Sequence, residues 1–406
     1  MNQTVSFQHA PVRRLPMPEF IAMLAFLFAT IAFSIDAMLP ALPQIAESLT
    51  PGNLNRAQLI LTSFVAGMGT GTLFAGPISD AIGRKRAITI GFAIYSCAAL
   101  AAIFAESIEM LLLARFIQGL GAAGPRIVGL ALVRDLYEGR EMARITSLVM
   151  MVFIIIPALA PSIGAGMIWL AGWHGVFAGF LFFALVGVSW LNLRQAETLP
   201  PERRRPLQVA PLKEAAREVL TDRHVMLCTF ILTLGFGQMF ALLSSAQQLF
   251  GEAYGKGDAF PYWFAAMALL SGSGTVLNAT FVIRFGMRRI AKWAYMMQTC
   301  VSSVMLVLIG ADLLPAALQF PAFFLWAVSV FFMAGVTFGN LNALALQKMG
   351  HIAGMAASVV AAISTVLATV IAAPVGLLYN GTALPVIIAT LICSGLAWFM
   401  MRFLRD

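Results

Sequence analysis

Charged side chains are scarce in this sequence. Asp, Glu, Lys and Arg make up 11% of the 406 residues, whereas a soluble globular chain carries about a quarter. Hydrophobic residues reach 60%, and the mean hydropathy is +0.87. A water-soluble fold cannot hide this much apolar surface, and many apolar runs exceed about 18 residues, the length of a membrane-spanning helix. The composition therefore excludes a soluble protein and indicates that lipid surrounds most of the chain.

Residues that form disulfides, metal sites or catalytic centres are also few. The four histidines stand in loops or at predicted helix ends. The four cysteines fall inside apolar runs of different predicted helices, as small hydrophobic residues do: Cys97, Cys228, Cys300 and Cys393. No paired His and carboxylate set, nucleophile elbow or phosphate loop occurs in a loop long enough to hold a site. We therefore expect no enzyme, no metal and no cofactor.

Apolar runs long enough to cross about 30 Å of hydrocarbon occur in two sets of six. The first set lies at 19–41, 58–79, 87–105, 109–133, 146–169 and 173–193. The second set lies at 225–249, 260–283, 290–311, 320–345, 353–378 and 383–403. We predict an all-α polytopic membrane protein of twelve transmembrane helices in two pseudo-symmetric six-helix bundles. The bundles comprise residues 1–193 and 224–406, joined by a cytoplasmic linker at 194–223 with an amphipathic segment at 213–220.

Positive charge is distributed unevenly among the loops. With both termini on the cytoplasmic side, the outside loops contain only Arg56 and Lys256, and Arg115 and Arg126 lie within helices. All other Lys and Arg residues then fall in cytoplasmic segments, as the positive-inside rule requires. This topology explains the net charge of +8 without a nucleic-acid partner.

A basic glycine turn occurs in both predicted halves. The loop after the second helix reads GPISDAIGRKR at 76–86, and the loop after the eighth reads RFGMRR at 284–289. The recurrence six helices later indicates two related bundles.

Several motifs resemble those of one family. The segment 76–86 resembles the loop motif between helices 2 and 3 of the major facilitator superfamily, although Ala81 stands where a basic residue is usual. LLLARFIQGLGAA at 111–123 resembles the helix 4 motif of its proton-antiporting drug exporters, and IDAMLPALPQIA at 35–46 resembles their helix 1 pattern. PALAPSIGAG at 157–166 resembles their helix 5 motif, with Pro157 where glycine is more usual.

Three further segments are similar to the bicyclomycin/chloramphenicol/florfenicol (Bcr/CflA-like) branch: VRDLY at 133–137, ETLPPERRR at 197–205 and AGMAAS at 353–358. The resemblance implies a drug:proton antiporter that exports small amphiphilic or phenicol-like compounds by alternating access and confers antibiotic resistance. It also implies a monomer in the bacterial inner membrane, with drug, protons and the lipid bilayer as its partners. The alternative is a facilitator or proton symporter of a small metabolite on the same fold.

Asp36 is the only acidic residue within a predicted span. An ionised carboxylate is costly in a low dielectric, so its protonated form becomes accessible near neutral pH, as proton coupling requires. The alternative is that Asp36 lies near the outer end of its helix and reaches interfacial water.

Arg115 and Arg126 are eleven residues apart, so they are expected to share one face of a helix and to point into the bundle. The resemblance assigns Arg115 an influence on proton uptake; the alternative is a snorkelling arginine near the inner end of the helix. Gln118, three residues on, is within reach of Arg115 or substrate. Arg126 is expected to pair with Asp36, to bind an anionic substrate group or to hold water.

Two further groups are expected to carry conformational roles. In the loop motif, Asp80 is expected to pair with basic groups as an inner latch, while the glycines allow close backbone approach. The alternative is that the basic cluster only fixes the topology. The residues of this gate motif are Gly76, Asp80, Gly83, Arg84 and Arg86, with Lys85 between them. In the helix 5 motif, prolines bend the helix and glycines allow close packing against a partner helix. The motif is therefore expected to form a rigid-body interface between the halves; the alternative is a purely structural role. Its residues are Pro157, Pro161, Gly164 and Gly166.

The second half contains amides but few charges within its spans: Gln238, Gln247, Gln248, Asn278, Gln298, Asn340 and Asn342. With 31 Phe and 22 Met in the chain, a soft aromatic cavity wall and broad specificity are expected.

Overall fold

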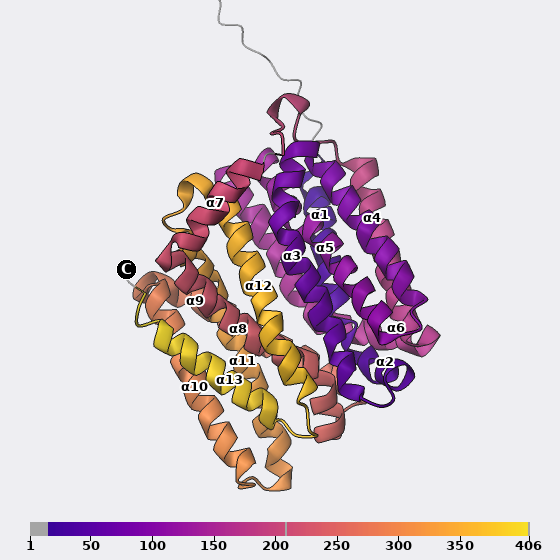
Figure 1. The fold of residues 1–406 in the computed structure, drawn as a ribbon, viewed down its shortest axis with the longest axis vertical. Coiled ribbons are helices and arrows are strands. Elements are labelled where there is room, and N and C mark those ends of the chain that lie inside the picture. Colours follow the sequence, from indigo (N-terminus) through magenta and orange to yellow (C-terminus); the bar gives the residue numbers. More distant parts are fainter. Residues whose placement is uncertain (1–14, 208, 405–406) are drawn as a thin grey trace, which may run out of the picture.

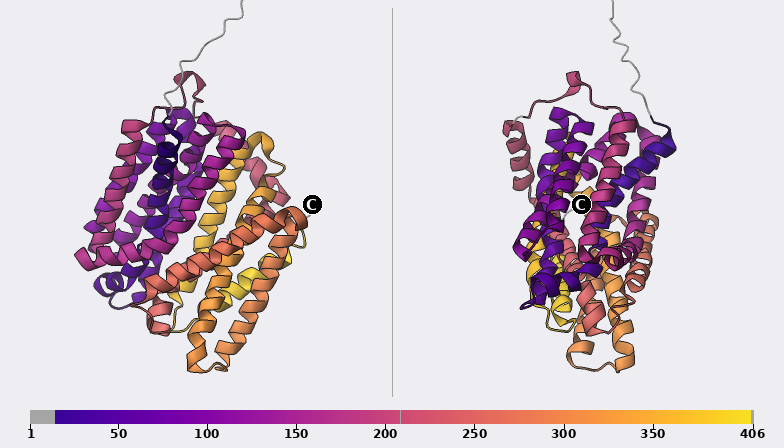
Figure 2. Two further views of the ribbon diagram at one scale, coloured as in Figure 1. Left: turned by 180° about the vertical axis from the view of Figure 1, so that it is seen from behind. Right: turned by 90° about the vertical axis from the view of Figure 1, so that its right-hand side faces the viewer.

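The computed structural model describes residues 15–207 and 209–404, and within these ranges the chain is helical with no strand. Figure 1 shows long helices running along a common direction, with the linker after α6 and helix α7 at one end. We call this end the linker face and the other end the opposite face. Figure 2 shows the linker spanning this end from the first half to the second.

The first half contains five long helical elements: α1 (Met17–Asp36), α3 (Leu59–Ile82), α4 (Arg84–Ile103), α5 (Ile108–Leu136) and α6 (Gly139–Arg194). Helix α6 is two helices joined at a turn, because Ala171 has φ −148° and Gly172 has φ +62°. It therefore accounts for both predicted spans at 146–169 and 173–193. Between α1 and α3 lie three short elements: η1 (Leu39–Ala41), α2 (Leu42–Leu49) and η2 (Leu54–Gln58).

The linker contains η3 (Pro201–Arg203) and the amphipathic helix α7 (Val209–Thr221), one turn longer at its start than the predicted segment. The second half contains α8 (Arg223–Gln248), α9 (Phe260–Phe285), α10 (Met287–Gly310), α11 (Ala316–Leu346), α12 (Ala353–Leu377) and α13 (Leu384–Met400). Its short elements are η4 (Leu249–Ala253) and η5 (Gly350–Ile352).

Ten helical segments of the described chain are long and apolar enough to cross a membrane. One of these segments lies in α6, which crosses twice because of its turn, and the shorter apolar helix α13 provides the twelfth crossing. The predicted twelve-helix fold is therefore confirmed. One boundary differs: the predicted first span at 19–41 is interrupted directly after Asp36, where α1 ends.

The internal repeat is visible in the backbone. Gly83 precedes α4 with φ +103°, and Gly286 precedes α10 with φ +80°. Glycine adopts this conformation without steric cost, so both basic loops make the same kind of turn between consecutive long helices.

The two halves meet along two pairs of helices. Helix α3 packs on α12, and α6 packs on α9, whereas the other extensive contacts join helices of the same half. In Figure 1, α12 lies between α3 and the remaining helices of the second half. The interface between the halves therefore consists mainly of these two helix pairs.

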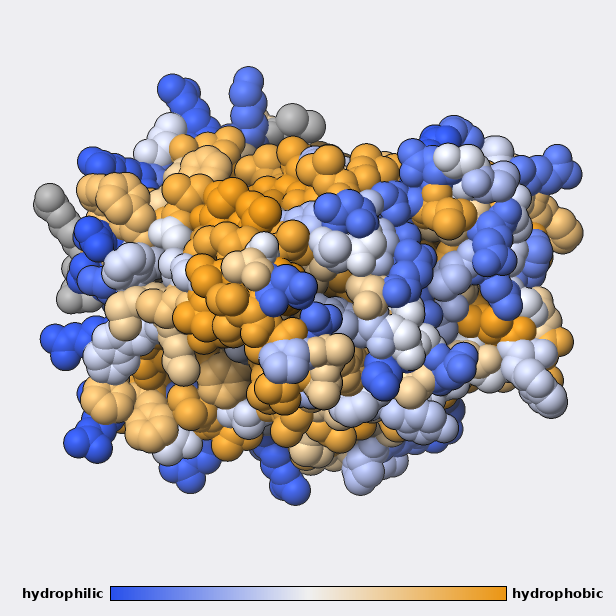
Figure 3. All heavy atoms as spheres, turned by 90° about the horizontal axis from the view of Figure 1, so that it is seen from below, coloured by the Kyte–Doolittle hydropathy of each residue, from blue (hydrophilic) through white to orange (hydrophobic). Residues whose placement is uncertain are grey.

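The outer surface of the bundle is apolar. Large side chains such as Trp169, Leu193 and Ile283 are 83–91% exposed, which would be costly in water but not in lipid. Figure 3 views the opposite face, where hydrophilic side chains gather mainly on one side and apolar side chains cover much of the rest.

Candidate functional site

Arg115 lies fully buried inside the first half. Its guanidinium donates to the Gln118 side-chain oxygen at 2.6 Å and to the Ser34 carbonyl at 3.0 Å. It also lies 4.3 Å from the centre of the Phe64 ring. Carbonyl oxygens and an aromatic face thus stabilise a charge that has no carboxylate partner among the described residues. The contact with Gln118 is the one that the spacing predicts.

The Arg115 cluster continues toward α4. The Ser34 hydroxyl is hydrogen-bonded to the Tyr95 hydroxyl. On α8, both amide atoms of Gln238 are buried and have no hydrogen-bond partner in the described chain. Buried amides without partners are destabilising. A further hydrogen-bond partner at Gln238 would therefore be stabilising.

Asp36 is the last residue of α1 and is only 6% exposed. Within the described residues it has no ion-pair partner. It stands two residues after Ser34, whose carbonyl binds Arg115. The interfacial alternative requires contact with water, whereas this side chain is packed among protein atoms.

Gly164 of α6 packs directly on the turn that follows Asp36. A Cβ atom at this position would collide with the carbonyl oxygen of Ala37, and would lie 3.0 Å from its Cα. Only glycine allows this approach of α6 to the end of α1. The sequence predicts that the helix 5 motif forms an interface between the halves or is purely structural, and Gly164 tests the first of these. That expectation is wrong for Gly164, which contacts its own half, although α6 does pack on α9 elsewhere.

Arg126 is half-buried, with a guanidinium nitrogen 4.0 Å from the Met68 sulfur. Phe64 and Met68 are one turn apart on α3, so Arg115 and Arg126 share the face of α5 toward α3, as predicted. Eleven residues separate them by about 16 Å along the helix. Among the described residues, no ion pair joins Arg126 to Asp36.

The position of Arg115 corrects one alternative. Arg115 follows the start of α5 at Ile108 by about two turns. It therefore lies toward the opposite face and not near the linker end of the helix. A snorkelling arginine at the inner end is excluded, since the side chain is also fully buried.

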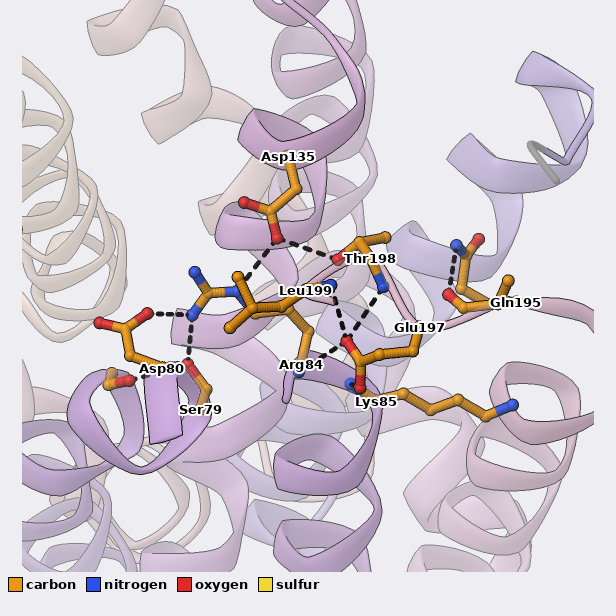
Figure 4. A network of polar contacts seen from close by, with 11 residues as sticks. Ser79, Asp80, Arg84, Lys85, Asp135, Gln195, Glu197, Thr198 and Leu199 are labelled. Carbon is orange, nitrogen blue, oxygen red and sulfur yellow. Dashed lines mark hydrogen bonds and ion pairs between the residues drawn. The ribbon is translucent and has the colours of Figure 1, made fainter. Parts of the chain in front are cut away.

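The gate motif forms a network of polar contacts at the linker face (Figure 4). Arg84 pairs with Asp80 and, at 3.0 Å, with Asp135 near the end of α5. Its guanidinium also donates to the Ser79 hydroxyl at 2.7 Å. Asp135 accepts a second hydrogen bond from the Thr198 hydroxyl at 2.9 Å. This network thus connects α3, α4 and α5 with the linker.

Glu197 of the linker binds the start of α4. Its carboxylate accepts hydrogen bonds from the backbone N–H groups of Arg84 at 2.9 Å and Lys85 at 3.1 Å. A Cβ atom at Gly83 would collide with this carboxylate. Anions are stabilised at helix N-termini by free N–H groups and the helix dipole. The motif at 197–205 contains Glu197, but only the fold shows what it contacts.

Two residues of the gate motif behave differently from the expectation. Gly76 makes no close backbone contact, because a Cβ atom there would meet only the Ser358 hydroxyl at 3.9 Å. Arg86 is exposed and does not join the network. The amine of Lys85 instead binds the Asn192 carbonyl at 2.8 Å.

A cavity of about 730 Å³ lies at the linker face between the halves. It is bounded by α3, α5, α12, η5 and the linker. Its polar lining includes Ser79, Asp80, Arg84, Arg134, His351 and Ser358. Ile127, next to Arg126, also lines it, so the cavity extends along α5 toward the buried arginines. Its volume is typical of a small-molecule site, which is about 300–1,000 Å³.

Polar contacts close the opposite face between the halves. The Asn55 amide donates to the carbonyls of Leu377 at 3.1 Å and Tyr379 at 2.8 Å. Gln58 is hydrogen-bonded to Gln248 and accepts from the Ser245 hydroxyl at 2.9 Å. We call these six residues the opposite-face seal: Asn55, Gln58, Ser245, Gln248, Leu377 and Tyr379.

Tyr379 completes the seal from the second half. Burial raises the pKa of Tyr379 to about 12, so its hydroxyl stays protonated and donates to the Gln248 carbonyl at 3.3 Å. Sequence analysis identified Gln248 only as an intramembrane amide. Its partners in η2 and after α12 could not be recognised, because they lie more than a hundred residues away along the chain.

Comparison with known proteins agrees with this architecture. Residues 23–373 match the Major Facilitator Superfamily. A Bacillus subtilis (strain 168) protein described as an uncharacterized MFS-type transporter, YdgK, is 30% identical over 394 residues, covering 93% of this chain and 94% of the relative. A Haemophilus influenzae protein described as a bicyclomycin resistance protein homolog is 28% identical over 389 residues, covering 94% and 96%.

A solved structure is also similar. The xylose transporter XylE from E. coli, in a partially occluded inward-open conformation, superposes with a TM-score of 0.73 at 13% identity, covering 96% of this chain and 98% of that one. At this identity the likeness shows the fold alone. Fold and family are those of multi-pass membrane transporters, which confirms the resemblance seen in the motifs. The chain belongs to the Major Facilitator Superfamily.

Proposed function

We propose that this transporter is a proton-coupled exporter of small amphiphilic or phenicol-like drugs in the bacterial inner membrane. The observation that carries the proposal is the buried carboxylate of Asp36, at the break after α1 and beside the Arg115 cluster. The relative named for bicyclomycin resistance supports drugs as the substrate class. The metabolite alternative has less support, because the described second half adds amides but no charge to the interior.

The proposed orientation places both termini and the linker in the cytoplasm, as the distribution of basic residues requires. In that orientation the 730 Å³ cavity opens to the cytoplasm while the opposite-face seal is closed. The structure then corresponds to an inward-facing state that is ready to take up drug. Residues 1–193 and 224–406 are proposed to rock as two units along α3–α12 and α6–α9.

The proposed coupling step uses the charge of Asp36. When the opposite side opens, water reaches the carboxylate and it takes up a proton, which neutralises it for the return through the occluded state. Gly164 connects this position to α6, and Ser34 connects it to Arg115 and Gln118. Protonation therefore changes the electrostatic balance around Arg115, while Arg126, next to the cavity, is proposed to hold polar or anionic groups of the substrate.

The first test is drug-triggered proton movement in proteoliposomes with an acidic interior. We expect chloramphenicol to release protons with the native chain and not with Asp36→Asn, because the amide copies the protonated carboxyl and cannot release its proton. Glu47→Gln is the matched control, since Glu47 is an exposed carboxylate on the adjacent helix α2 and its loss leaves coupling intact.

Three outcomes would contradict the proposal in different ways. Transport of drug without proton movement by the native chain would indicate facilitated transport. Drug and proton moving in the same direction would indicate symport. Coupling in Asp36→Asn equal to that of the native chain would remove Asp36 from the mechanism.

A further inference from the structure

A groove of about 500 Å³ lies between α10 and α13, away from the cavity between the halves. Figure 1 shows these helices side by side, and they pack on each other. The groove is formed by the first turns of α10 and the last turns of α13. Three cations, two tryptophans and one methionine line it: Arg289, Lys292, Trp293, Met296, Trp398 and Arg402.

The groove is basic and unbalanced by acid. Of the described residues, no carboxylate lines it, and none forms an ion pair with Arg289, Lys292 or Arg402. The guanidinium of Arg402 lies 5.0 Å from the centre of the Trp398 ring, which orients it by a cation–π contact. Three like charges held around one hollow repel one another, so an anion bound between them would relieve that repulsion.

An unused donor points to the same ligand. The indole nitrogen of Trp398 is buried and has no hydrogen-bond partner in the described chain. An indole N–H that is left without an acceptor is destabilising. An oxygen of a bound anion would satisfy it. The groove thus offers both the positive charge and the hydrogen-bond donor that a phosphate group requires.

The position of the groove selects a lipid as the source of that phosphate. It lies at the ends of two membrane-spanning helices, where the hydrocarbon gives way to headgroups. Apolar side chains of the same helices are exposed beside it, including Met297 (66%), Leu396 (49%) and Phe399 (51%). These provide a surface for acyl chains, whereas a soluble phosphate would gain nothing from them.

We propose that the groove between α10 and α13 is a binding site for an anionic phospholipid, with the lipid phosphate held by Arg289, Lys292, Arg402 and the Trp398 N–H. Tryptophan and basic residues between transmembrane helices are the elements from which such headgroup sites are built. The site is independent of the transport mechanism proposed above, since none of its residues belongs to that mechanism.

The test is native mass spectrometry of the full-length detergent-solubilised protein titrated with dioleoyl phosphatidylglycerol or dioleoyl phosphatidylcholine. We expect the native chain to bind phosphatidylglycerol at least tenfold more tightly than phosphatidylcholine. The triple variant Arg289→Gln/Lys292→Gln/Arg402→Gln should lose that preference. The matched control Arg140→Gln/Lys213→Gln/Arg217→Gln, which removes three exposed cations elsewhere, should keep it.

Trp398→Phe keeps an aromatic side chain but removes the N–H donor, so it should weaken phosphatidylglycerol binding several-fold. If the triple variant aggregates, Trp398→Phe and the single variant Arg289→Gln test whether the groove binds phosphatidylglycerol. Equal affinity of the native chain for the two lipids would overturn the proposal, as would equal binding by the triple variant and its control. Displacement of phosphatidylglycerol by millimolar inorganic phosphate would indicate a soluble-anion site and would also overturn it.

Discussion

At the scale of single residues, the approach of Gly164 to Ala37 determines how α6 meets the end of α1. The colliding atom is a backbone carbonyl oxygen, which cannot rotate away as a flexible side chain can. Any side chain at 164 must therefore displace a helix beside the buried carboxylate of Asp36. Two residues further along α6, Gly166 has nothing within 4 Å of the position of a Cβ atom.

This difference gives a prediction with an internal control. Gly164→Ala should destabilise the protein by about 1–3 kcal/mol through overpacking, seen as a lower Tm in detergent. Gly166→Ala should leave the Tm unchanged or raise it slightly, because alanine favours helix by about 1 kcal/mol over glycine. If both variants have the same Tm as the native chain, the close contact beside Asp36 does not constrain α6.

At the level of single residues, the rare charges within apolar runs can be recognised from the sequence, whereas their contact partners cannot. Asp36, Arg115 and Arg126 stand out because charge within apolar runs is costly and therefore uncommon. The partners of Arg115 include a backbone carbonyl of α1 and an aromatic ring of α3. Backbone carbonyls and phenylalanines are present throughout such a chain, so composition cannot indicate which of them lies nearby.

At the scale of elements, Glu197 ties the linker to the first half. Its carboxylate also accepts the backbone N–H groups of Thr198 at 3.0 Å and Leu199 at 3.1 Å, so one side chain orders the start of the linker and caps α4. The backbone N–H of Arg205 adds a bond to the Asp80 carbonyl at 3.0 Å. The first segment of the linker, from Glu197 to Arg205, is thus bound to the first half at both of its ends.

We predict that Glu197→Ala releases this segment. Loss of a charged cap costs about 0.5–2 kcal/mol, and a change of one or two kcal/mol alters a local equilibrium by a factor of about 5–30. Limited trypsin digestion after Arg203 and Arg204 should accelerate by a similar factor.

Glu202→Ala is the control for this experiment, because Glu202 is an exposed glutamate of the same linker. Its cleavage rate should match that of the native chain. Equal rates for Glu197→Ala and Glu202→Ala would show that the carboxylate of Glu197 does not hold the linker.

At the scale of the whole molecule, the two ends of the interface between the halves differ. The linker face has a cavity, whereas the opposite face is joined by hydrogen bonds from η2 to α8 and to the end of α12. Each hydrogen bond contributes about 0.5–1.5 kcal/mol net. The seal therefore supplies only a few kcal/mol, an amount that substrate or proton binding can reverse during a transport cycle.

Weakening the seal should favour opening of this face. We predict that Asn55→Ala/Gln58→Ala adds a population with a longer distance between spin labels at Asn53 and Asn380, which are exposed on either side of the seal. The expected shift is about 1–3 kcal/mol, because several bonds are lost together. The measurement is pulsed electron–electron resonance in a background with the exposed cysteines Cys97 and Cys300 replaced by serine.

Asn342→Ala serves as the control, since among the described residues the Asn342 amide bonds only to the Phe338 carbonyl within α11, at 2.9 Å. Its distance distribution should equal that of the native chain. An unchanged distribution in the double variant would mean that packing, and not the polar seal, keeps the opposite face closed.

The sequence by itself determined the membrane class, the number of spans and the family, because hydrophobic run length, charge bias and local motifs are properties of neighbouring residues. It also indicated that Asp36 and the two arginines of α5 are exceptional. Only the tertiary structure decided that Asp36 ends α1, that Arg115 binds Ser34 and not a carboxylate, and that Glu197 caps α4. These contacts join residues far apart in the chain, and their geometry follows from how the helices pack against one another.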